Sequence, residues 1–411
     1  AVNDMIVNPV DGLIYTSVPG AVTDGTGNTI TSIDPATGNV IASGFVGSEP
    51  GRIAMSDNGQ VLWTTLAGSD VIRRYDIPTR TPGPQFSPDG GVSRVRDMAV
   101  QPGSPETLVV ATQSDGTWMY DDGVRRPNPA RRPPPNSQVF ALIGSLEFAG
   151  GPGTLFGYNS LSTGYELYRI NIDANGLSTE TSVGNLISGF NGDIKFLEGR
   201  LYTASGRVVD PLANTIVGTF ASSGSSIAVD TVTRKAFILS SGSIRVFNID
   251  TFRELGTINF PNTSSSYSSL ARWGSNGLAF RAFGSSESRI ILIQSPLVGE
   301  GELPVGLAFP TTLFSTFEGS AGVQITVVRS GEVNSEASVN YATSDGTAVA
   351  GEDYIAVSGT ISFAPGETVK GFTVPIINDT VFENGNETFS IMLSEPSGTG
   401  AQLIFPSTTT V

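Results

Sequence analysis

The chain has 411 residues, with 38 acidic against 23 basic side chains, a net charge of −15, and neither cysteine nor histidine. The missing residue types exclude catalytic triads that need histidine, zinc sites with nitrogen and sulfur ligands, and disulfides. The acidity disfavours nucleic acid as a partner, because phosphates repel a negative surface, and no run of 18 or more apolar residues predicts a membrane span.

A strand repeat occupies the first 300 residues. Glycine and proline contribute 49 and 25 residues between short segments rich in Val, Ile, Thr, Ser and Phe, which predicts an all-β fold of short strands and tight turns. A unit of apolar strand, polar turn and second apolar strand recurs with a mean step of about 44 residues. Its second strands align at Leu13, Val61, Leu108, Leu155, Leu201, Ala236 and Leu278.

A third strand follows several of these pairs. Four strands in a unit of this length are typical of a propeller blade, so we predict a seven-bladed β-propeller over residues 1–297. The blades resemble the YVTN or NHL-like propellers of bacterial surface proteins. The last blade has no clear fourth strand after Gln294, and we expect that strand to precede Ala1.

An aspartate ends the third strand in five of the units. These residues are Asp34, Asp76, Asp173, Asp210 and Asp250. We expect each to cap its own turn through an Asx hydrogen bond. The alternative is that they form a ligand site.

A second domain is predicted after a linker at residues 298–304. From residue 301 onward the chain carries 12 acids and two bases. Alternating segments such as VQITVVR from Val323 and ASVNYAT from Ala337 predict short antiparallel strands. We therefore expect an immunoglobulin-like β-sandwich over residues 305–411, whose last strand is incomplete at Val411.

The sandwich sequence carries a long ordered motif. The run YATSDGTAVAGEDY, followed by GTISFAPGETVKGFTVPIINDTVFENGNETFSIMLSEP, resembles the Calx-β domain of sodium/calcium exchangers, integrin β4 and many bacterial surface proteins. The resemblance implies a Ca²⁺ site at one end of the sandwich, formed by acids from separate loops. It assigns the metal ligands to Glu318, Asp353, Asp379, Glu383 and Glu387.

The turn at Asp379 departs from the family pattern. It reads Asn-Asp-Thr, where the family often has two or three consecutive aspartates. The resemblance therefore implies few ions and weak binding, on the order of 10⁻⁴ to 10⁻³ M. The alternative is that these acids serve only to keep the sandwich soluble.

Three functions remain open from the sequence. The favoured one is an extracellular or cell-surface binding or adhesion protein, whose propeller face meets a protein or carbohydrate ligand. The second is a structural subunit of a surface layer, sheath or filament that self-assembles by strand addition. The third is a carboxylate- or metal-dependent hydrolase that uses residues such as Asp97, Glu147 and Asp193 near the inner strands. Their spacing does not single them out, so we do not favour an enzyme.

Overall fold

The computed structural model describes most of the chain. The residues outside it are 24, 89, 114–115, 128–141, 191, 263, 285–287, 300–304, 332, 334, 380–385, 399 and 405, together with the side chains of residues 179 and 180. The chain divides into two compact units, Ala1–Glu300 and Gly301–Val411. The all-β prediction is confirmed, since the described residues contain only one 3-10 helix, Val92–Arg94. None of their helices is long and apolar enough to cross a membrane.

The first unit consists of seven antiparallel sheets that follow one another along the chain. Sheet 1 contains β1 (Asp4–Val7), β2 (Ile14–Val18), β3 (Thr29–Ile33) and β4 (Val40–Phe45). Sheet 2 contains β5 (Pro50–Met55), β6 (Val61–Leu66), β7 (Val71–Asp76) and β8 (Thr81–Phe86). Sheet 3 contains β9 (Val95–Val100), β10 (Thr107–Thr112), β11 (Thr117–Asp121) and β12 (Val124–Arg125). Sheet 4 contains β13 (Ser145–Phe148), β14 (Thr154–Tyr158), β15 (Leu167–Asp173) and β16 (Gly176–Val183).

The remaining three sheets complete this unit. Sheet 5 contains β17 (Ile194–Leu197), β18 (Arg200–Thr203), β19 (Arg207–Asp210) and β20 (Thr215–Thr219). Sheet 6 contains β21 (Ser226–Asp230), β22 (Lys235–Ser240), β23 (Ser243–Asn248) and β24 (Glu254–Asn259). Sheet 7 contains three described strands, β25 (Ser266–Trp273), β26 (Gly277–Phe283) and β27 (Ser288–Gln294).

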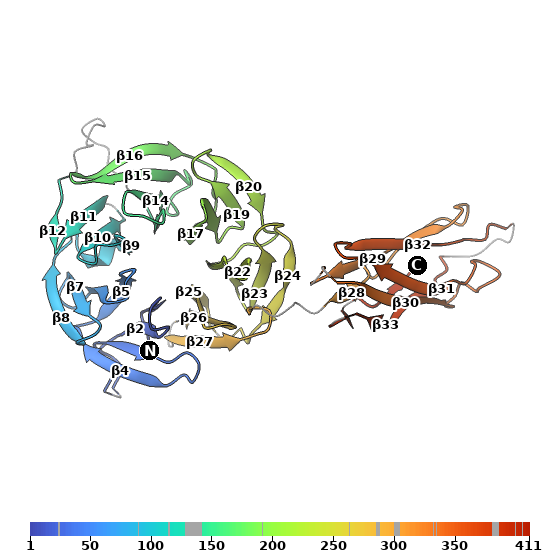
Figure 1. Ribbon diagram of the computed structural model, residues 1–411, viewed down its shortest axis with the longest axis horizontal. Coiled ribbons are helices and arrows are strands. Elements are labelled where there is room, and N and C mark those ends of the chain that lie inside the picture. Colours follow the sequence, from blue (N-terminus) through green and yellow to red (C-terminus); the bar gives the residue numbers. More distant parts are fainter. Residues whose placement is uncertain are drawn as a thin grey trace. The chain divides into compact units, whose positions relative to one another are not determined.

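The seven sheets lie around a ring (Figure 1). The first strand of each sheet contacts the first strand of the next, from β1 through β5, β9, β13, β17, β21 and β25, and β25 in turn contacts β1. Strands such as β4, β8, β16 and β20 lie at the outside in Figure 1, whereas β5, β9, β17 and β25 lie toward the centre. We call this unit the ring. Sheets at opposite ends of its sequence are therefore neighbours in space.

Burial explains why the second strand of each sheet was the part of the repeat that the sequence showed clearly. Every residue of β6 and of β10 is buried, and strands covered on both faces are continuously apolar. Outer strands such as β4 and β8 contain no fully buried residue. Between sheets 2 and 3, Trp63 packs with Val110 and Tyr120, and its indole N–H donates to the carbonyl of Pro105 at 2.9 Å.

The turn aspartates behave as caps in four of the five units. Asp34, Asp76, Asp173 and Asp210 each accept a backbone N–H two or three residues further on, at 2.7 to 2.9 Å. Asp250 differs, because Asn248 caps that turn and the Asp250 carboxylate pairs with Arg234 at 2.5 Å. The prediction of Asx turns is confirmed at four positions and is wrong at Asp250.

The second unit is a sandwich of two four-stranded sheets. One sheet has the order β32 (Val369–Val374), β29 (Val323–Ser330), β28 (Gly306–Ala308) and β34 (Gln402–Leu403). The other has the order β31 (Ser358–Phe363), β30 (Ala337–Ser344), β33 (Ser390–Ser397) and β35 (Thr408–Thr410). Alternate residues of β29 are buried, which places Ile325 and Val327 in a core with Phe309, Phe363 and Leu393. The pairing is antiparallel except between β28 and β34, which are parallel.

Candidate calcium site and the central cavity

Three loops meet at one end of the sandwich. The backbone N–H of Asp379 donates to Glu318 Oε1 at 3.0 Å, which joins the loop before β29 to the loop after β32. The N–H of Ile377 donates to the carbonyl of Asp353 at 2.9 Å. The N–H of Thr388, at the far end of the loop that joins β32 to β33, donates to Thr347 Oγ1 at 2.7 Å. We call this region the loop end of the sandwich.

The loop that carries Asp353 is held by its own side chains. Asp345 Oδ1 accepts the N–H of Ala350 at 3.0 Å and the hydroxyl of Tyr354 at 2.6 Å. Tyr354 is buried, and its ring stacks on Phe389 with centroids 4.1 Å apart. Burial, followed by the bond to Asp345, raises the pKa of Tyr354 to about 12. These contacts fix the position of the residue next to Tyr354, which is Asp353.

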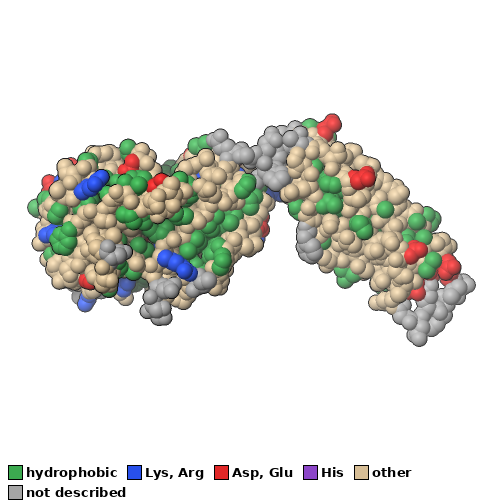
Figure 2. All heavy atoms as spheres, turned by 90° about the horizontal axis from the view of Figure 1, so that it is seen from below, with side chains coloured by type: hydrophobic (Ala, Val, Ile, Leu, Met, Phe, Trp, Pro, Cys, Tyr) green, Lys and Arg blue, Asp and Glu red, His purple; other side chains and the backbone are tan. Residues whose placement is uncertain are grey.

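Asp353 and Glu387 form a pair of like charges. Desolvation, followed by the negative charge of Asp353 and a hydrogen bond with it, raises the pKa of the Glu387 carboxyl. The charge of Glu352 acts in the same direction. Carboxylates that face one another repel unless a proton or a cation lies between them. Acidic side chains gather at one end of the sandwich on the face seen in Figure 2.

A scan against protein families finds one match on this unit. Residues 304–411 match the model of the Calx-beta domain. The sandwich is a Calx-beta domain.

Relatives of this Calx-beta domain are exchanger proteins. The chain is 38% identical over 112 residues to the sodium/calcium exchanger Calx of Drosophila melanogaster, covering 27% of this chain and 12% of the exchanger. It is 41% identical over 87 residues to sodium/calcium exchanger 3 of Rattus norvegicus, covering 21% and 9%. Among solved structures, the apo form of the Calx CBD1 domain is 37% identical, with a TM-score of 0.25, over 26% of this chain and 92% of that chain. The chain thus spans about a tenth of the exchangers that it matches.

The Calx-beta domain brings the proposed ligands together in pairs. The carboxylate of Glu318 accepts the backbone N–H of Asp379, the carboxylates of Asp353 and Glu387 act on one another, and Glu383 lies outside the described residues. Among the carboxylates that the structure describes, no group of three is arranged to hold a metal ion. The donors nevertheless suit calcium, a hard cation that takes oxygen ligands from carboxylates, backbone carbonyls and water. The sequence analysis did not name Glu352, although its place directly before Asp353 in the sequence could have indicated it.

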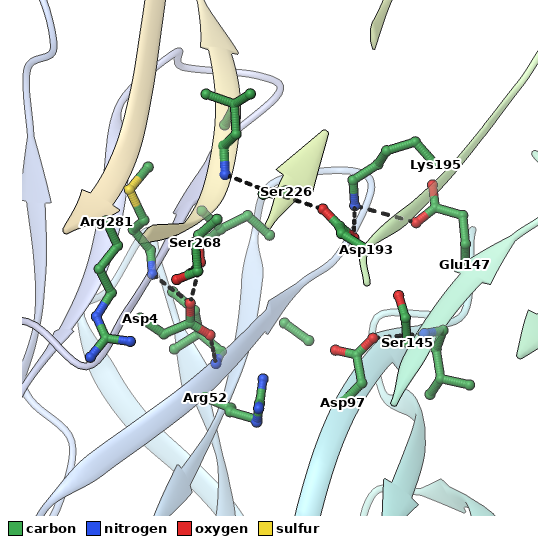
Figure 3. A pocket seen from close by; sticks show the side chains of 18 of the residues that line it. Asp4, Arg52, Asp97, Ser145, Glu147, Asp193, Lys195, Ser226, Ser268 and Arg281 are labelled. Atoms are coloured by element: carbon green, nitrogen blue, oxygen red, sulfur yellow. Dashed lines mark hydrogen bonds and ion pairs between the residues drawn. The ribbon is translucent and has the colours of Figure 1, made fainter. Parts of the chain in front are cut away.

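The ring encloses a second candidate site. A cavity of about 1870 Å³ lies among the first strands of its sheets, and Figure 3 shows polar side chains pointing into it. Asp97, Glu147 and Asp193, which the sequence suggested as hydrolase candidates, all line this cavity.

Polar residues stand at equivalent positions of the seven sheets around the cavity, and several of them bond to the neighbouring sheet. Each stands just before a buried apolar residue of an inner strand, and they are Asp4, Arg52, Asp97, Ser145, Asp193, Ser226 and Ser269. Asp4 accepts the N–H of Ile53 at 3.2 Å, and Asp97 accepts the N–H of Leu146 at 2.7 Å. Ser226 accepts the N–H of Leu270 at 3.1 Å, and Ser269 donates to Asp4 at 3.1 Å. We call these seven residues the polar ring.

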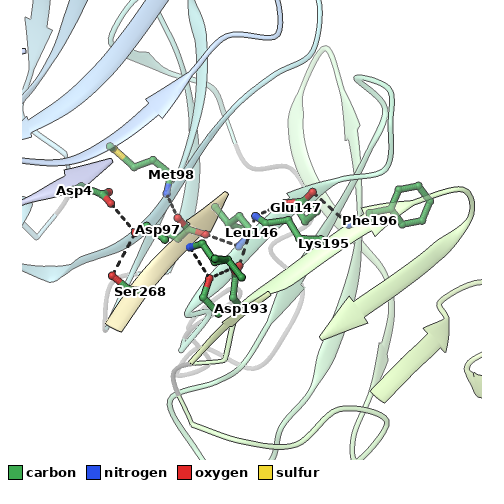
Figure 4. Close-up of polar contacts among 12 residues, drawn as sticks. Asp4, Asp97, Met98, Leu146, Glu147, Asp193, Lys195, Phe196 and Ser268 are labelled. Carbon is green, nitrogen blue, oxygen red and sulfur yellow. Dashed lines mark hydrogen bonds and ion pairs between the residues drawn. The ribbon is translucent and has the colours of Figure 1, made fainter. Parts of the chain in front are cut away.

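Charges on one side of the cavity are coupled (Figure 4). Lys195 Nζ lies 3.5 Å from Glu147 and 3.6 Å from Asp193, and these two charges raise the pKa of Lys195. Burial raises the pKa of Glu147 against the opposing effect of Lys195. Burial likewise raises the pKa of Asp97 to about 6, although the charge of Arg52 and two backbone N–H groups oppose it. Since Asp97 and Glu147 also hold neighbouring strands through backbone N–H groups, these carboxylates have a structural role.

Proposed function

We propose that the Calx-beta domain binds Ca²⁺ at its loop end, through Asp353, Glu387, Glu318 and Asp379. The observation that carries the proposal is the like-charged pair of Asp353 and Glu387, which a cation would stabilise. A solved relative is named calcium binding domain CBD12 of CALX1.1. When bound, calcium would neutralise these carboxylates and tie together loops that hydrogen bonds already bring into contact.

We further propose that the ring is a seven-bladed β-propeller of the YVTN or NHL-like kind. Its support is the number of sheets, their antiparallel order and the contacts of their first strands around the ring. In this proposal the protein is an extracellular or cell-surface binding protein, in which the ring takes a ligand and the Calx-beta domain responds to calcium. A weak calcium site suits the millimolar calcium outside cells.

Calorimetric titration of the full chain with CaCl₂ tests the calcium proposal. The double variant Asp353→Ala, Asp379→Ala removes one carboxylate from each pair, and Glu336→Ala is the matched control. Glu336 is exposed next to the first residue of β30, whereas the Asp353 loop follows the last residue of that strand. We expect saturable heat in the wild type and the control, and its loss in the double variant. Equal heat in all three proteins, or none at millimolar calcium, would contradict the proposal.

A second candidate function, assembly by strand addition, has one observation in its favour. Sheet 7 has three described strands where the other sheets of the ring have four, and β27 is its outermost strand. An open edge offers backbone groups to an added strand. Sedimentation velocity over a range of concentrations tests this candidate. Growth into larger species supports it, and a monomer at every concentration contradicts it.

A further inference from the structure

Arg52 breaks the pattern of the polar ring. At six of the seven positions the side chain is an aspartate or a serine, both of which can accept a hydrogen bond. A guanidinium has no acceptor, so Arg52 cannot take the N–H of the next sheet as Asp4 and Asp97 do. That N–H, on Met98, is bonded instead by the carboxylate of Asp97 at 2.9 Å. Arg52 therefore does not make the hydrogen bond to the next sheet that Asp4 and Asp97 make from the same position.

The Arg52 side chain is available to the cavity. It is exposed and lines the cavity, and within the described part of the chain it makes no hydrogen bond or ion pair. Arg281 also lines the cavity and uses only its Nε for described hydrogen bonds, to the Val2 carbonyl at 3.0 Å and to Ser288 Oγ at 3.1 Å. Burial, and the charge of Arg52, lower the pKa of Arg281. The charge of Asp4 acts on Arg281 and that of Asp97 on Arg52, but the guanidinium of Arg52 and the two terminal nitrogens of Arg281 make no described hydrogen bond, so these donors remain for a ligand.

The opposite side of the cavity has a different chemistry. In Figure 3, Arg281 and Asp4 lie toward one side, and Glu147, Asp193 and Lys195 lie toward the other. The three carboxylates there, including Asp97, outnumber the single lysine. Carboxylate oxygens accept more than one hydrogen bond, so those that already bind backbone N–H groups retain acceptor capacity. This side suits a ligand that donates hydrogen bonds.

Hydroxyl groups make up much of the remaining lining. Ten serines face the cavity, with four aromatic residues, Phe148, Phe196, Tyr267 and Phe283. The volume of about 1870 Å³ exceeds the roughly 300 to 1,000 Å³ of a pocket for one small ligand. Abundant hydroxyls, a few aromatic faces and room for more than one ring suit a hydroxyl-rich ligand.

We propose that the central cavity binds an acidic saccharide, whose carboxylate pairs with Arg52 and Arg281 and whose hydroxyls bond to Asp97, Asp193 and the serines. A guanidinium and a carboxylate match in a bidentate geometry that a neutral sugar cannot use. This inference deepens the ligand-binding role proposed for the ring and uses no residue of the Calx-beta domain. A negative result for saccharide binding can therefore be distinguished from a negative result in the calcium titration.

Titration of the full chain with sodium glucuronate tests the inference, with glucose and sodium glutamate as comparison ligands. Arg52→Ser places at this position the residue that three other members of the polar ring carry, so we expect the ring to fold. Arg253→Ala, an exposed arginine outside the cavity lining, is the control. We expect saturable glucuronate binding that weakens about tenfold to a hundredfold in Arg52→Ser and is unchanged in Arg253→Ala.

Three results would overturn the inference. One is the absence of saturable glucuronate binding in the millimolar range. Another is equal affinity of the wild type and a folded Arg52→Ser variant, with folding checked by tryptophan fluorescence. The last is binding of glucose or glutamate as tightly as glucuronate, because either would mean that the cavity does not recognise a sugar and its carboxylate together.

Discussion

Replacing Asp97 by asparagine is expected to stabilise the ring at pH 8 and to destabilise it slightly near pH 4. Burial raises the pKa of Asp97 from 3.8 to about 6, so the folded ring holds the proton more tightly than the unfolded chain does. The stability that this proton provides is fully present below pH 4 and is lost as the pH rises through 6. The difference between the two pKa values corresponds to about 3 kcal/mol, an upper bound because Asp97 is partly open to the cavity. Asparagine carries no charge and therefore avoids that loss, but its single amide oxygen can accept only one of the two backbone N–H groups that the two oxygens of Asp97 accept.

Urea denaturation followed by tryptophan fluorescence measures this effect. All three tryptophans, Trp63, Trp118 and Trp273, belong to the ring, so the signal reports that unit alone. We expect Asp97→Asn to be about 1 to 2 kcal/mol more stable than the wild type at pH 8, and about 1 kcal/mol less stable near pH 4, where only the lost hydrogen bond counts. Asp57→Asn is the control, because exposed Asp57 also accepts a backbone N–H from the next sheet, that of Gly103 at 2.9 Å. A gain that is absent at pH 8, or that is the same at both pH values, would refute the reasoning.

Three further predictions concern packing and the loop end. Glu387→Gln should raise the melting temperature of the calcium-free Calx-beta domain, because it removes one charge of the carboxylate pair; calorimetry in EDTA checks this, and a fall would contradict it. Tyr354→Phe should lower the free energy of unfolding of that domain by about 0.5 to 1.5 kcal/mol, because the buried hydrogen bond to Asp345 is lost. Chemical denaturation measures this, and an unchanged stability would mean that the bond contributes nothing. Gly44→Ala should lower the free energy of unfolding of the ring by about 1 to 3 kcal/mol, because a Cβ there would clash with the Tyr75 hydroxyl. Adding Tyr75→Phe to the same chain should restore part of this stability, and no recovery would contradict the proposed clash.

Periodicity located the sheets of the ring because their second strands are buried on both faces and are rich in apolar residues. Val61 and Leu108, two of the aligned positions, lie in β6 and β10, which are buried throughout. The same periodicity could not predict the hydrogen bonds between neighbouring sheets. They join residues such as Asp97 and Leu146, which are 49 apart, and no local pattern says which side chain faces the next sheet. Asp97 was therefore named as a candidate without a reason to prefer it.

The candidate calcium site could likewise be predicted only in part from the sequence. A motif placed Glu318 and Asp379 in one site, but their contact spans 61 residues and depends on how two loops fold. The contact between Asp353 and Glu387 depends in turn on Tyr354, whose stacking on Phe389 is a tertiary contact. Motifs can thus identify the acids of a site, while their pairing follows from packing that only the folded chain contains.

The contacts that join sheet 7 to sheet 1 bear on how the ring forms. Ser269 bonds to Asp4 across 265 residues, and Arg281 to Val2 across 279, whereas most contacts between sheets join residues about one repeat apart. Contacts between distant parts of a chain form late and slow folding, and domains generally fold as units. Sheet 1 therefore lacks one of its two neighbours until β25 and β26 have been synthesised, and the preceding sheets alone cannot close the ring.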